Sequence, residues 1–253
     1  MMTKSNFRIL RPIFITVIIA AAATVSGCQS KAPLPKPQSA NLPTPLAVGT
    51  GVGPGATSIT INSSTGVAKG DVIFTYVGTD SSTNITVTTP IGWTLIGGPL
   101  NPATGIESYL FQRVSDGTDG ASYTFNFSGA VRGAAYASQI TYHNVNSTTP
   151  VDGSISTATQ TSGTSIVLPA VSPVGSSDLL VAFVAIYNGF SGTPAATGMT
   201  LEGNLGNENA ILDQQLTSSG STGTRTVTNL NDNVSTGFLF AVTPSGGVIQ
   251  PVE

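Results

Sequence analysis

Charged side chains, cysteine and histidine are all scarce in this sequence. Only 8% of the 253 residues are charged, and the chain has one cysteine and one histidine. An average soluble domain has about 25% charged residues. A single cysteine allows no disulfide within the monomer, so we expect a hydrophobic core to stabilise the fold. Zinc and other transition metals require several histidine or cysteine ligands, so we expect no such metal and no cofactor.

Basic residues are too few and too scattered for nucleic-acid binding. Without residues 1–27 the chain keeps six Lys and Arg against twelve Asp and Glu, a net charge of −6. Binding to nucleic acid depends on clustered Lys and Arg that displace counterions. The six remaining cations are spread along the chain, and two of them fall in residues 29–46. Nucleic acid is therefore not an expected partner.

The N-terminus has the layout of an export signal. Residues 1–11 carry three cations, residues 12–25 are apolar, and Val25-Ser26-Gly27-Cys28 follows directly. The apolar stretch has 14 residues, whereas a membrane-spanning helix needs about 20. We therefore predict a signal peptide over residues 1–27 that is removed, rather than a permanent transmembrane helix.

These last four residues resemble the lipobox of bacterial lipoproteins. In that family the cysteine thiol receives a diacylglycerol, and the amino terminus created by cleavage is usually acylated as well. The resemblance implies that Cys28 is lipidated and holds the chain at a membrane, since several acyl chains anchor more firmly than one. A buried free cysteine is the alternative. By resemblance to Gram-negative sorting rules, Gln29 in place of aspartate implies a cell-envelope location at the outer membrane.

Residues 28–50 are expected to form the lipidated cysteine and a proline-rich tether. Residues 29–46 contain five prolines and no periodic apolar pattern. Such a segment favours an extended, semi-rigid conformation. At the rise of a polyproline helix it could reach about 50 Å. The tether would separate the folded part from the membrane.

After residue 50 the sequence predicts strands and no helices. Residues 122–127 alternate between aromatic and polar side chains, which is typical of a strand with one buried face. Residues 72–77 and 179–187 are apolar on both faces and are too short to span a bilayer, so we expect them to be central strands. The fold class is therefore predicted to be all-β.

Four pairs of short matches indicate a tandem duplication of residues 51–147 and 148–245. They recur in order at offsets of 107, 107, 106 and 103 residues. Chance similarity would not keep four matches nearly in phase. The matched segments begin at Thr57 and Thr164, Asp71 and Asp178, Gly92 and Gly198, and Gly120 and Gly223. Residues 246–253 would then be a C-terminal tail.

The repeated segments resemble a two-repeat β-sandwich module of uncharacterised bacterial secreted, lipoprotein and phage-associated proteins. The resemblance is carried by the segments 70–73, 90–95, 123–125 and 150–152. It implies a jelly-roll-like β-sandwich and assigns no catalytic residue. The second half departs from the pattern because Met199 stands where the first has Trp93. One continuous sandwich and two tandem sandwiches both remain open, and the absence of a linker over residues 145–155 favours a single domain.

His143 would have to serve any Ser-His-Asp device, because it is the only histidine. The apolar residues of the segment 136–142 place His143 on the opposite face, with Gln139 and Thr141. We therefore expect it to be a solvent-facing residue at a strand end. No Gly-x-Ser-x-Gly motif supplies a nucleophile. A hydrolase that uses His143 is thus an unfavoured alternative, and the protein is not expected to be an enzyme.

A few other residues suggest binding chemistry and also have simpler structural interpretations. Asp116 and Asp119 lie in a glycine-rich turn and form a weak candidate for calcium, although Asp-Gly also suits a hairpin turn. Asp71 and Asp178 precede corresponding strands and are expected to hydrogen-bond to their own turns. Trp93 could stack on a sugar, but its counterpart Met199 favours a position in the core.

The sequence as a whole favours a membrane-anchored protein that acts by binding, adhesion or envelope structure. A neutral, hydroxyl-rich composition suits a carbohydrate-binding module, which is the main alternative within this class. The expected partners are the membrane, through the lipid, and a glycan or protein at the cell surface. The ligand-binding residues are not identified by the sequence.

Overall fold

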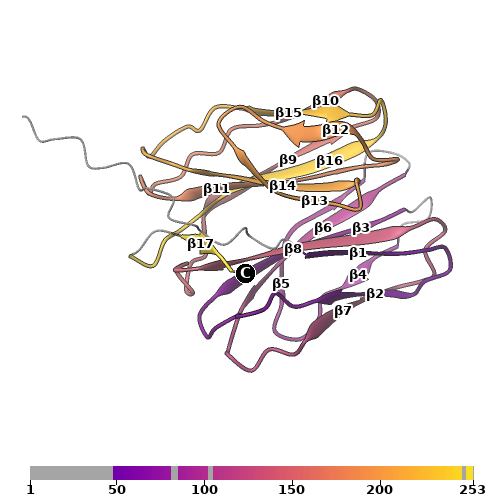
Figure 1. Cartoon of the computed structure of the whole chain (residues 1–253), viewed down its shortest axis with the longest axis horizontal. Coiled ribbons are helices and arrows are strands. Elements are labelled where there is room, and N and C mark those ends of the chain that lie inside the picture. The colour runs from indigo at the N-terminus through magenta and orange to yellow at the C-terminus, as the bar shows by residue number, and fades with distance from the viewer. Residues whose placement is uncertain (1–47, 81–84, 102–104, 247–248, 253) are drawn as a thin grey trace, which may run out of the picture. The chain divides into compact units, whose positions relative to one another are not determined.

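Seventeen β-strands and no helix make up the part of the chain that the computed structural model describes (Figure 1). That part is residues 48–253 without 81–84, 102–104, 247–248 and 253. Cys28, the signal segment 1–27 and the tether up to residue 47 lie outside it. Within it, no helix is long and apolar enough to cross a membrane. The prediction of an all-β fold is confirmed.

Eight strands come from the first half of the described chain and eight from the second, followed by one short strand near the C-terminus. The first eight are β1 (Val48–Val52), β2 (Ser58–Asn62), β3 (Val72–Thr79), β4 (Val87–Thr88), β5 (Thr94–Leu100), β6 (Glu107–Val114), β7 (Ser122–Phe127) and β8 (Ala135–His143). The others are β9 (Val151–Gln160), β10 (Ser165–Leu168), β11 (Leu179–Ile186), β12 (Phe190–Ala195), β13 (Thr200–Leu205), β14 (Asn209–Gln215), β15 (Arg225–Leu230), β16 (Ser235–Val242) and β17 (Gln250–Pro251).

Each half forms one large and one small antiparallel sheet. The first large sheet has the order β1-β8-β3-β6-β5, and the first small sheet has the order β2-β7-β4. The second large sheet is β9-β16-β11-β14-β13, and the second small sheet is β10-β15-β12. The two orders correspond strand by strand. Both follow the jelly-roll arrangement, except that β5 and β13 join the large sheets. Duplication of the sequence itself stays a prediction.

The burial of individual strands agrees with the sequence pattern. β7 alternates between exposed and buried residues, as predicted for residues 122–127. Every residue of β3 and of β11 is buried, as predicted for central strands. A strand is buried on both faces only if its sheet is covered on both sides. The large sheets must therefore each be covered twice.

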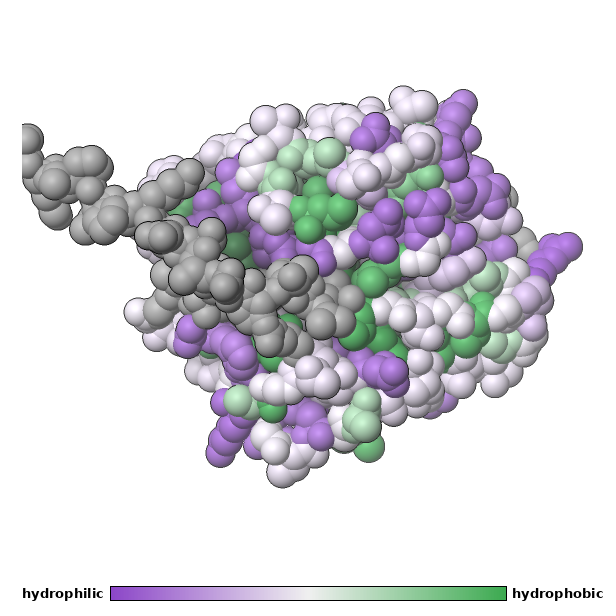
Figure 2. All heavy atoms as spheres, viewed as in Figure 1, coloured by the Kyte–Doolittle hydropathy of each residue, from purple (hydrophilic) through white to green (hydrophobic). Residues whose placement is uncertain are grey.

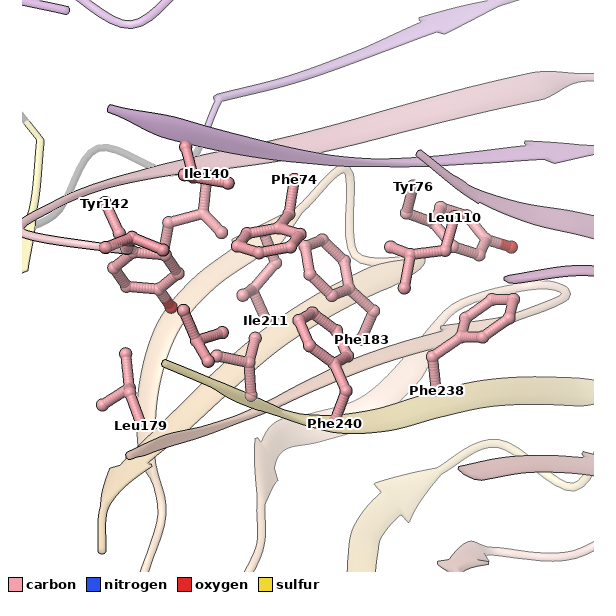
Figure 3. Packing of buried hydrophobic residues seen from close by; sticks show 14 of the residues in the cluster. Phe74, Tyr76, Leu110, Ile140, Tyr142, Leu179, Phe183, Ile211, Phe238 and Phe240 are labelled. Carbon is pink, nitrogen blue, oxygen red and sulfur yellow. The ribbon is translucent and has the colours of Figure 1, made fainter. Parts of the chain in front are cut away.

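Three hydrophobic cores provide this double cover. Two of them lie within the halves, each between a large sheet and its small sheet. The third, which we call the central interface, lies between the two large sheets (Figure 1). It contains Phe74 and Tyr142 of the first large sheet and Phe183, Phe238 and Phe240 of the second (Figure 3). The Phe74 and Phe240 rings have centroids 5.0 Å apart. Two jelly-roll sandwiches thus pack together through their large sheets.

Trp93 lies in the core of the first sandwich, as predicted from its counterpart. Its side chain is 8% exposed and meets the rings of Tyr123 and Phe125 edge to face, at centroid distances of 5.0 and 5.2 Å. Met199 packs in a partly buried position against the core of the second sandwich. Both positions therefore serve packing, and Trp93 offers no free ring face for a sugar.

The folded part extends beyond both predicted boundaries. β1 begins at Val48, inside the segment 28–50 that we predicted to be tether. At the other end, β17 pairs with β8. Ile249 and Val252 are 4% and 1% exposed, so these residues of the predicted tail are part of the fold. A two-residue strand has too little periodicity to be recognised in the sequence, which explains the error.

The face of β8 that carries Gln139 and Thr141 was also predicted wrongly. Both residues are fully buried rather than wet. The reason is the cover on both sides of the first large sheet, where Thr75 donates a hydrogen bond of 3.1 Å to the Gln139 side chain. Gln139 and Thr141 thus have polar partners on other segments, Thr75 of β3 and Ser64, instead of marking a solvent-facing surface.

Two groups of polar side chains cross the central interface. The Tyr76 hydroxyl is 2.7 Å from the Ser108 hydroxyl, which is 2.7 Å from the Thr236 hydroxyl of the second half. Elsewhere the Tyr142 hydroxyl donates a hydrogen bond of 3.0 Å to Asp213 of β14. Buried hydroxyls lose stability unless they are paired. These contacts therefore favour one registration of the two sandwiches.

Asp213 also meets a second carboxyl group, that of Glu202 on β13. Burial, followed by the charge of Asp213 and a hydrogen bond to it, raises the pKa of Glu202 to about 8. Burial raises the pKa of Asp213 to about 6, against the hydrogen bonds from Tyr142 and Glu202. The folded state therefore holds these protons more tightly than the unfolded chain does.

We expect this pair to make the protein less stable as the pH rises. Because both pKa values are raised on folding, the stabilisation is complete below the ordinary carboxyl pKa and is lost as the pH passes through about 6 and 8. Between pH 5 and 8, the unfolding free energy of Glu202→Gln should fall by about 1–2 kcal/mol less than that of the wild type. Urea denaturation at several pH values measures this.

Asp116→Asn is the matched control, because Asp116 is an exposed carboxylate whose pKa is lowered and which titrates below this range. If the stability of Glu202→Gln depended on pH as that of the wild type does, the Glu202–Asp213 pair would not be the cause of the pH dependence.

Candidate functional site

A cleft opens where the central interface reaches the C-terminal ends of β3 and β11. We call it the tyrosine cleft. Its inner end has a volume of about 10 Å³, roughly the space of one water molecule. Its outer part is a shallow, open hollow of about 480 Å³ that shares Asp80 and Tyr187 with the inner end. The other polar side chains that line the small inner part are Tyr76, Thr79, Tyr136, Glu208 and Asn209, and those that line the outer part are Arg132 and Asn233.

Small side chains explain why the sheets leave a gap there. The middle of the central interface is filled by phenylalanine rings from both sheets (Figure 3). At the inner end of the cleft, the lining from β3 and β11 includes Gly78 and Ala185 instead. An added Cβ at Gly78 would lie 2.5 Å from the Tyr76 hydroxyl, so glycine is needed for the Tyr76 ring to pass.

The tyrosine cleft carries both acidic and basic groups. Burial, followed by a hydrogen bond to Glu208, raises the pKa of Tyr136. Burial likewise raises the pKa of Glu208, against its hydrogen bond from Tyr136. Burial also raises the pKa of Asp80, while the charge of Arg132 opposes this. Gly133 adjoins this carboxylate so closely that an added Cβ would lie 1.6 Å from it. The cleft therefore offers hydrogen-bond acceptors and donors beside two tyrosine rings.

Arg113 pairs with both carboxylates of the calcium candidate, Asp116 and Asp119. Arg113 Nε lies 2.6 Å from Asp119 Oδ1, and its Nη2 lies 3.5 Å from Asp116 Oδ2. The Ser115 hydroxyl donates to Asp119, and Thr118 donates to Asp116 through its amide and its hydroxyl. These contacts fix the turn and supply both carboxylates with donors from the protein, which favours the structural interpretation over calcium. In the described part of the chain, no three or more His, Cys, Asp or Glu side chains are grouped to hold a metal.

His143 is paired with Asp71 rather than simply facing solvent. His143 Nδ1 lies 2.6 Å from Asp71 Oδ1, and the other carboxylate oxygen accepts a 2.6 Å hydrogen bond from the Ala68 amide. Asp71 thus bonds to its own turn, as predicted, and also to the histidine. The prediction missed the histidine because the two residues are 72 positions apart and meet only through the pairing of β3 with β8.

The surroundings of His143 supply the acid of a Ser-His-Asp arrangement but not the serine. The pair borders an open hollow of about 460 Å³ that Ser147 and Ser245 also line. Among the described residues, the hydrogen bond of His143 is to Asp71, and none joins it to either serine. A charge-relay arrangement requires a nucleophile within hydrogen-bond reach of the histidine. The pair is therefore better explained as an ion pair that joins two strand ends.

Sequence reasoning also missed a carboxyl pair in the second half. Asp178 is 1% exposed and lies against Asp152. Burial, followed by contact with Asp152, raises the pKa of Asp178 to about 6. Asp152 and Asp178 are 26 positions apart, which is no recognisable motif spacing. The two residues meet only in the folded chain, where β9 lies beside the loop that precedes β11. Carboxyl groups in direct contact are also closer than the 5 Å or more that glycoside hydrolysis requires.

Comparison with protein-family models, curated proteins and solved structures finds no match for this chain. The site must therefore be interpreted from its own geometry.

We expect loss of His143 to destabilise the fold. His143→Ala leaves the buried Asp71 carboxylate without the imidazole that is 2.6 Å from it. Because the His143 side chain is 38% exposed, we expect a loss of only about 1 kcal/mol at pH 6. Urea denaturation measures it. The double variant Asp71→Asn with His143→Ala is the control, because it removes the uncompensated charge and should regain part of the stability. Equal stability of His143→Ala and the wild type would contradict a structural ion pair.

Proposed function

We propose that this protein is a lipid-anchored envelope lipoprotein that binds a glycan, without catalysing a reaction, in the tyrosine cleft. Lipidation of Cys28 and delivery to the outer membrane rest on the Val25-Ser26-Gly27-Cys28 motif and on Gln29. The observation that carries the binding role is a cleft at the end of the central interface in which two tyrosines adjoin two carboxyl groups and an arginine.

The direction of β1 separates the cleft from the first described residue of the chain. β1 is antiparallel to β8, with Val48 opposite Gln139 and Val52 opposite Ala135. Tyr136 of the cleft is therefore at the end toward which β1 runs. Val48, the described residue nearest to Cys28 along the chain, is about 10 Å farther along the strand.

The chemistry of the cleft suits a sugar. Aromatic rings with a polar edge supply apolar contact to a ligand at little entropic cost. Carboxylates accept and guanidinium and amide groups donate hydrogen bonds, which matches a ligand rich in hydroxyls. In the view of Figure 2, hydrophobic residues form small patches among hydrophilic ones. A surface of this kind favours a polar ligand over a large apolar one.

A hydrolase that uses His143 has less support. Asp71 orients the imidazole, but no described contact supplies a nucleophile. The tyrosine cleft also lies at the other end of β8 from His143. We therefore assign the binding role to the cleft and a structural role to the histidine.

Glycan-array and whole-cell binding with the full chain in detergent test the binding role. Tyr187→Ala should weaken binding about tenfold or more, because loss of a central aromatic contact typically costs over 1 kcal/mol. Tyr187→Phe keeps the ring and should retain most of the affinity. Asp80→Asn should also weaken binding, whereas the distant Asp116→Asn should not. Absence of binding to any glycan or cell surface, or equal binding by Tyr187→Ala, would rule out the proposal.

Lipidation and sorting can be tested separately from binding. Cys28→Ser should lose incorporation of labelled palmitate and move from the membrane fraction to the soluble fraction, because the acyl chains are the proposed anchor. Gln29→Asp should keep the label and shift from the outer to the inner membrane. Ser39→Ala in the tether is the control and should change neither property. A labelled or membrane-bound Cys28→Ser protein would show that the anchor lies elsewhere.

A further inference from the structure

Among the described residues, the inner end of the tyrosine cleft is lined by two acidic side chains and by no basic one. The acids are Asp80 and Glu208. The basic side chain of the cleft, Arg132, lines the outer hollow and belongs to an exposed residue. Burial raises the pKa of Glu208, and the charge of Asp80 raises it further, so the two carboxyl groups are close enough for their charges to interact. A positive charge bound between them would stabilise both.

A buried hydroxyl group without a partner belongs to the same end of the cleft. Thr79 of β3 is fully buried, and its Oγ1 has no hydrogen-bond partner among the described residues. Thr79 lines the inner end together with the two acids. Buried polar atoms in folded proteins nearly always have a hydrogen-bond partner, so an unpaired one at a cavity indicates a place for a bound polar group.

The size and the acceptors of this end match an ammonium group. The inner cavity of about 10 Å³ has room for roughly one water molecule, and an ammonium group is of similar size. An ammonium group has three N–H donors and no acceptor. Asp80, Glu208 and Thr79 supply three acceptor groups. Cations are also attracted to tyrosine rings, and Tyr136 and Tyr187 line this end. A neutral hydroxyl group would leave both carboxylate charges uncompensated.

We propose that the inner end of the tyrosine cleft binds the ammonium group of an unacetylated amino sugar. This inference rests on the glycan-binding role of the cleft and specifies which glycans it takes. The ammonium group pairs with Asp80 and Glu208, and such charge-assisted hydrogen bonds are about twice as strong as neutral ones. The sugar ring lies in the outer hollow, where Arg132 and Asn233 can donate hydrogen bonds to its hydroxyls. An N-acetyl group lacks the charge and is too large for a cavity that holds one water molecule.

The test is isothermal titration of the full chain in detergent with a glucosamine tetrasaccharide and with its fully N-acetylated form. The wild type should bind the unacetylated form about tenfold or more tightly, because acetylation removes the charge that pairs with the two carboxylates. Glu208→Gln should lose most of this preference, while its amide oxygen can still accept the hydrogen bond from Tyr136. Thr79→Val should weaken binding of the unacetylated form severalfold without lowering the Tm, because it removes an unpaired buried hydroxyl.

Asp116→Asn is the matched control, because it removes one carboxylate beyond Val114, which pairs with the opposite end of β3 from Thr79. It should keep the preference of the wild type. Asp80→Asn should lose the preference as Glu208→Gln does, and it replaces that variant if thermal unfolding shows that Glu208→Gln does not fold. A preference that Asp116→Asn loses as fully as Glu208→Gln would assign it to the net charge of the protein and would overturn the proposal.

The outcomes separate this inference from the glycan-binding role on which it rests. Equal binding of the two tetrasaccharides, binding of other glycans alone, or a preference that Glu208→Gln keeps would overturn the ammonium site. In each of these cases the cleft would still bind a glycan, as long as Tyr187→Ala weakens that binding. If neither tetrasaccharide and no glycan on the array binds, the glycan-binding role fails, and the ammonium site fails with it.

Discussion

The structure depends on the face-to-face packing of its two large sheets. Each large sheet also carries a small sheet on its outer face, so its central strands have no surface left for water. This constraint makes every residue of β3, β11 and β16 buried. It also explains the low charge of the chain, since a central strand can carry a polar residue only where a partner is available.

The same constraint determines where ligands can be bound. The middle of the central interface is filled by rings such as Phe74, Phe183 and Phe240, which leave no room for another molecule. A cavity can form only where this packing ends. At the C-terminal ends of β3 and β11, Gly78 and Ala185 replace large side chains, and the tyrosine cleft opens between the halves. The cleft thus depends on the association of both sandwiches, and neither half contains all of it.

The sequence predicts those features that depend on local periodicity. The alternation of β7, the doubly apolar β3 and β11, and the buried position of Trp93 follow from patterns within a few residues. The wrong expectations concern the environment of a residue rather than its strand. Gln139 and Thr141 alternate with Ile140 and Tyr142 as exposed residues would, yet both are buried because a second layer covers that face.

Functional residues escape sequence reasoning for the same reason. The tyrosine cleft combines Asp80 and Tyr136 of the first half with Tyr187 and Glu208 of the second, and no spacing rule joins positions so far apart. Asp116 and Asp119 illustrate the converse. Their local spacing suggests a calcium site, but both carboxylates pair with Arg113 of the preceding strand. The spacing of residues in a short motif indicates a binding site only when the side chains that contact the motif in the fold are also known.

The buried acids illustrate how a chain with few charges must use them. Asp71 is neutralised by His143 and Asp119 by Arg113, while Asp213 receives a hydrogen bond from Tyr142. In each case a charged or donating side chain comes from a neighbouring strand or from the opposite sheet. Asp178 differs, because the side chain beside it is another acid, Asp152, with which it shares a hydrogen bond. The two halves share one strand order but offset the burial of this acid differently: the first half places a histidine beside it, whereas in the second half the raised pKa of about 6 favours a proton held between two carboxyl groups.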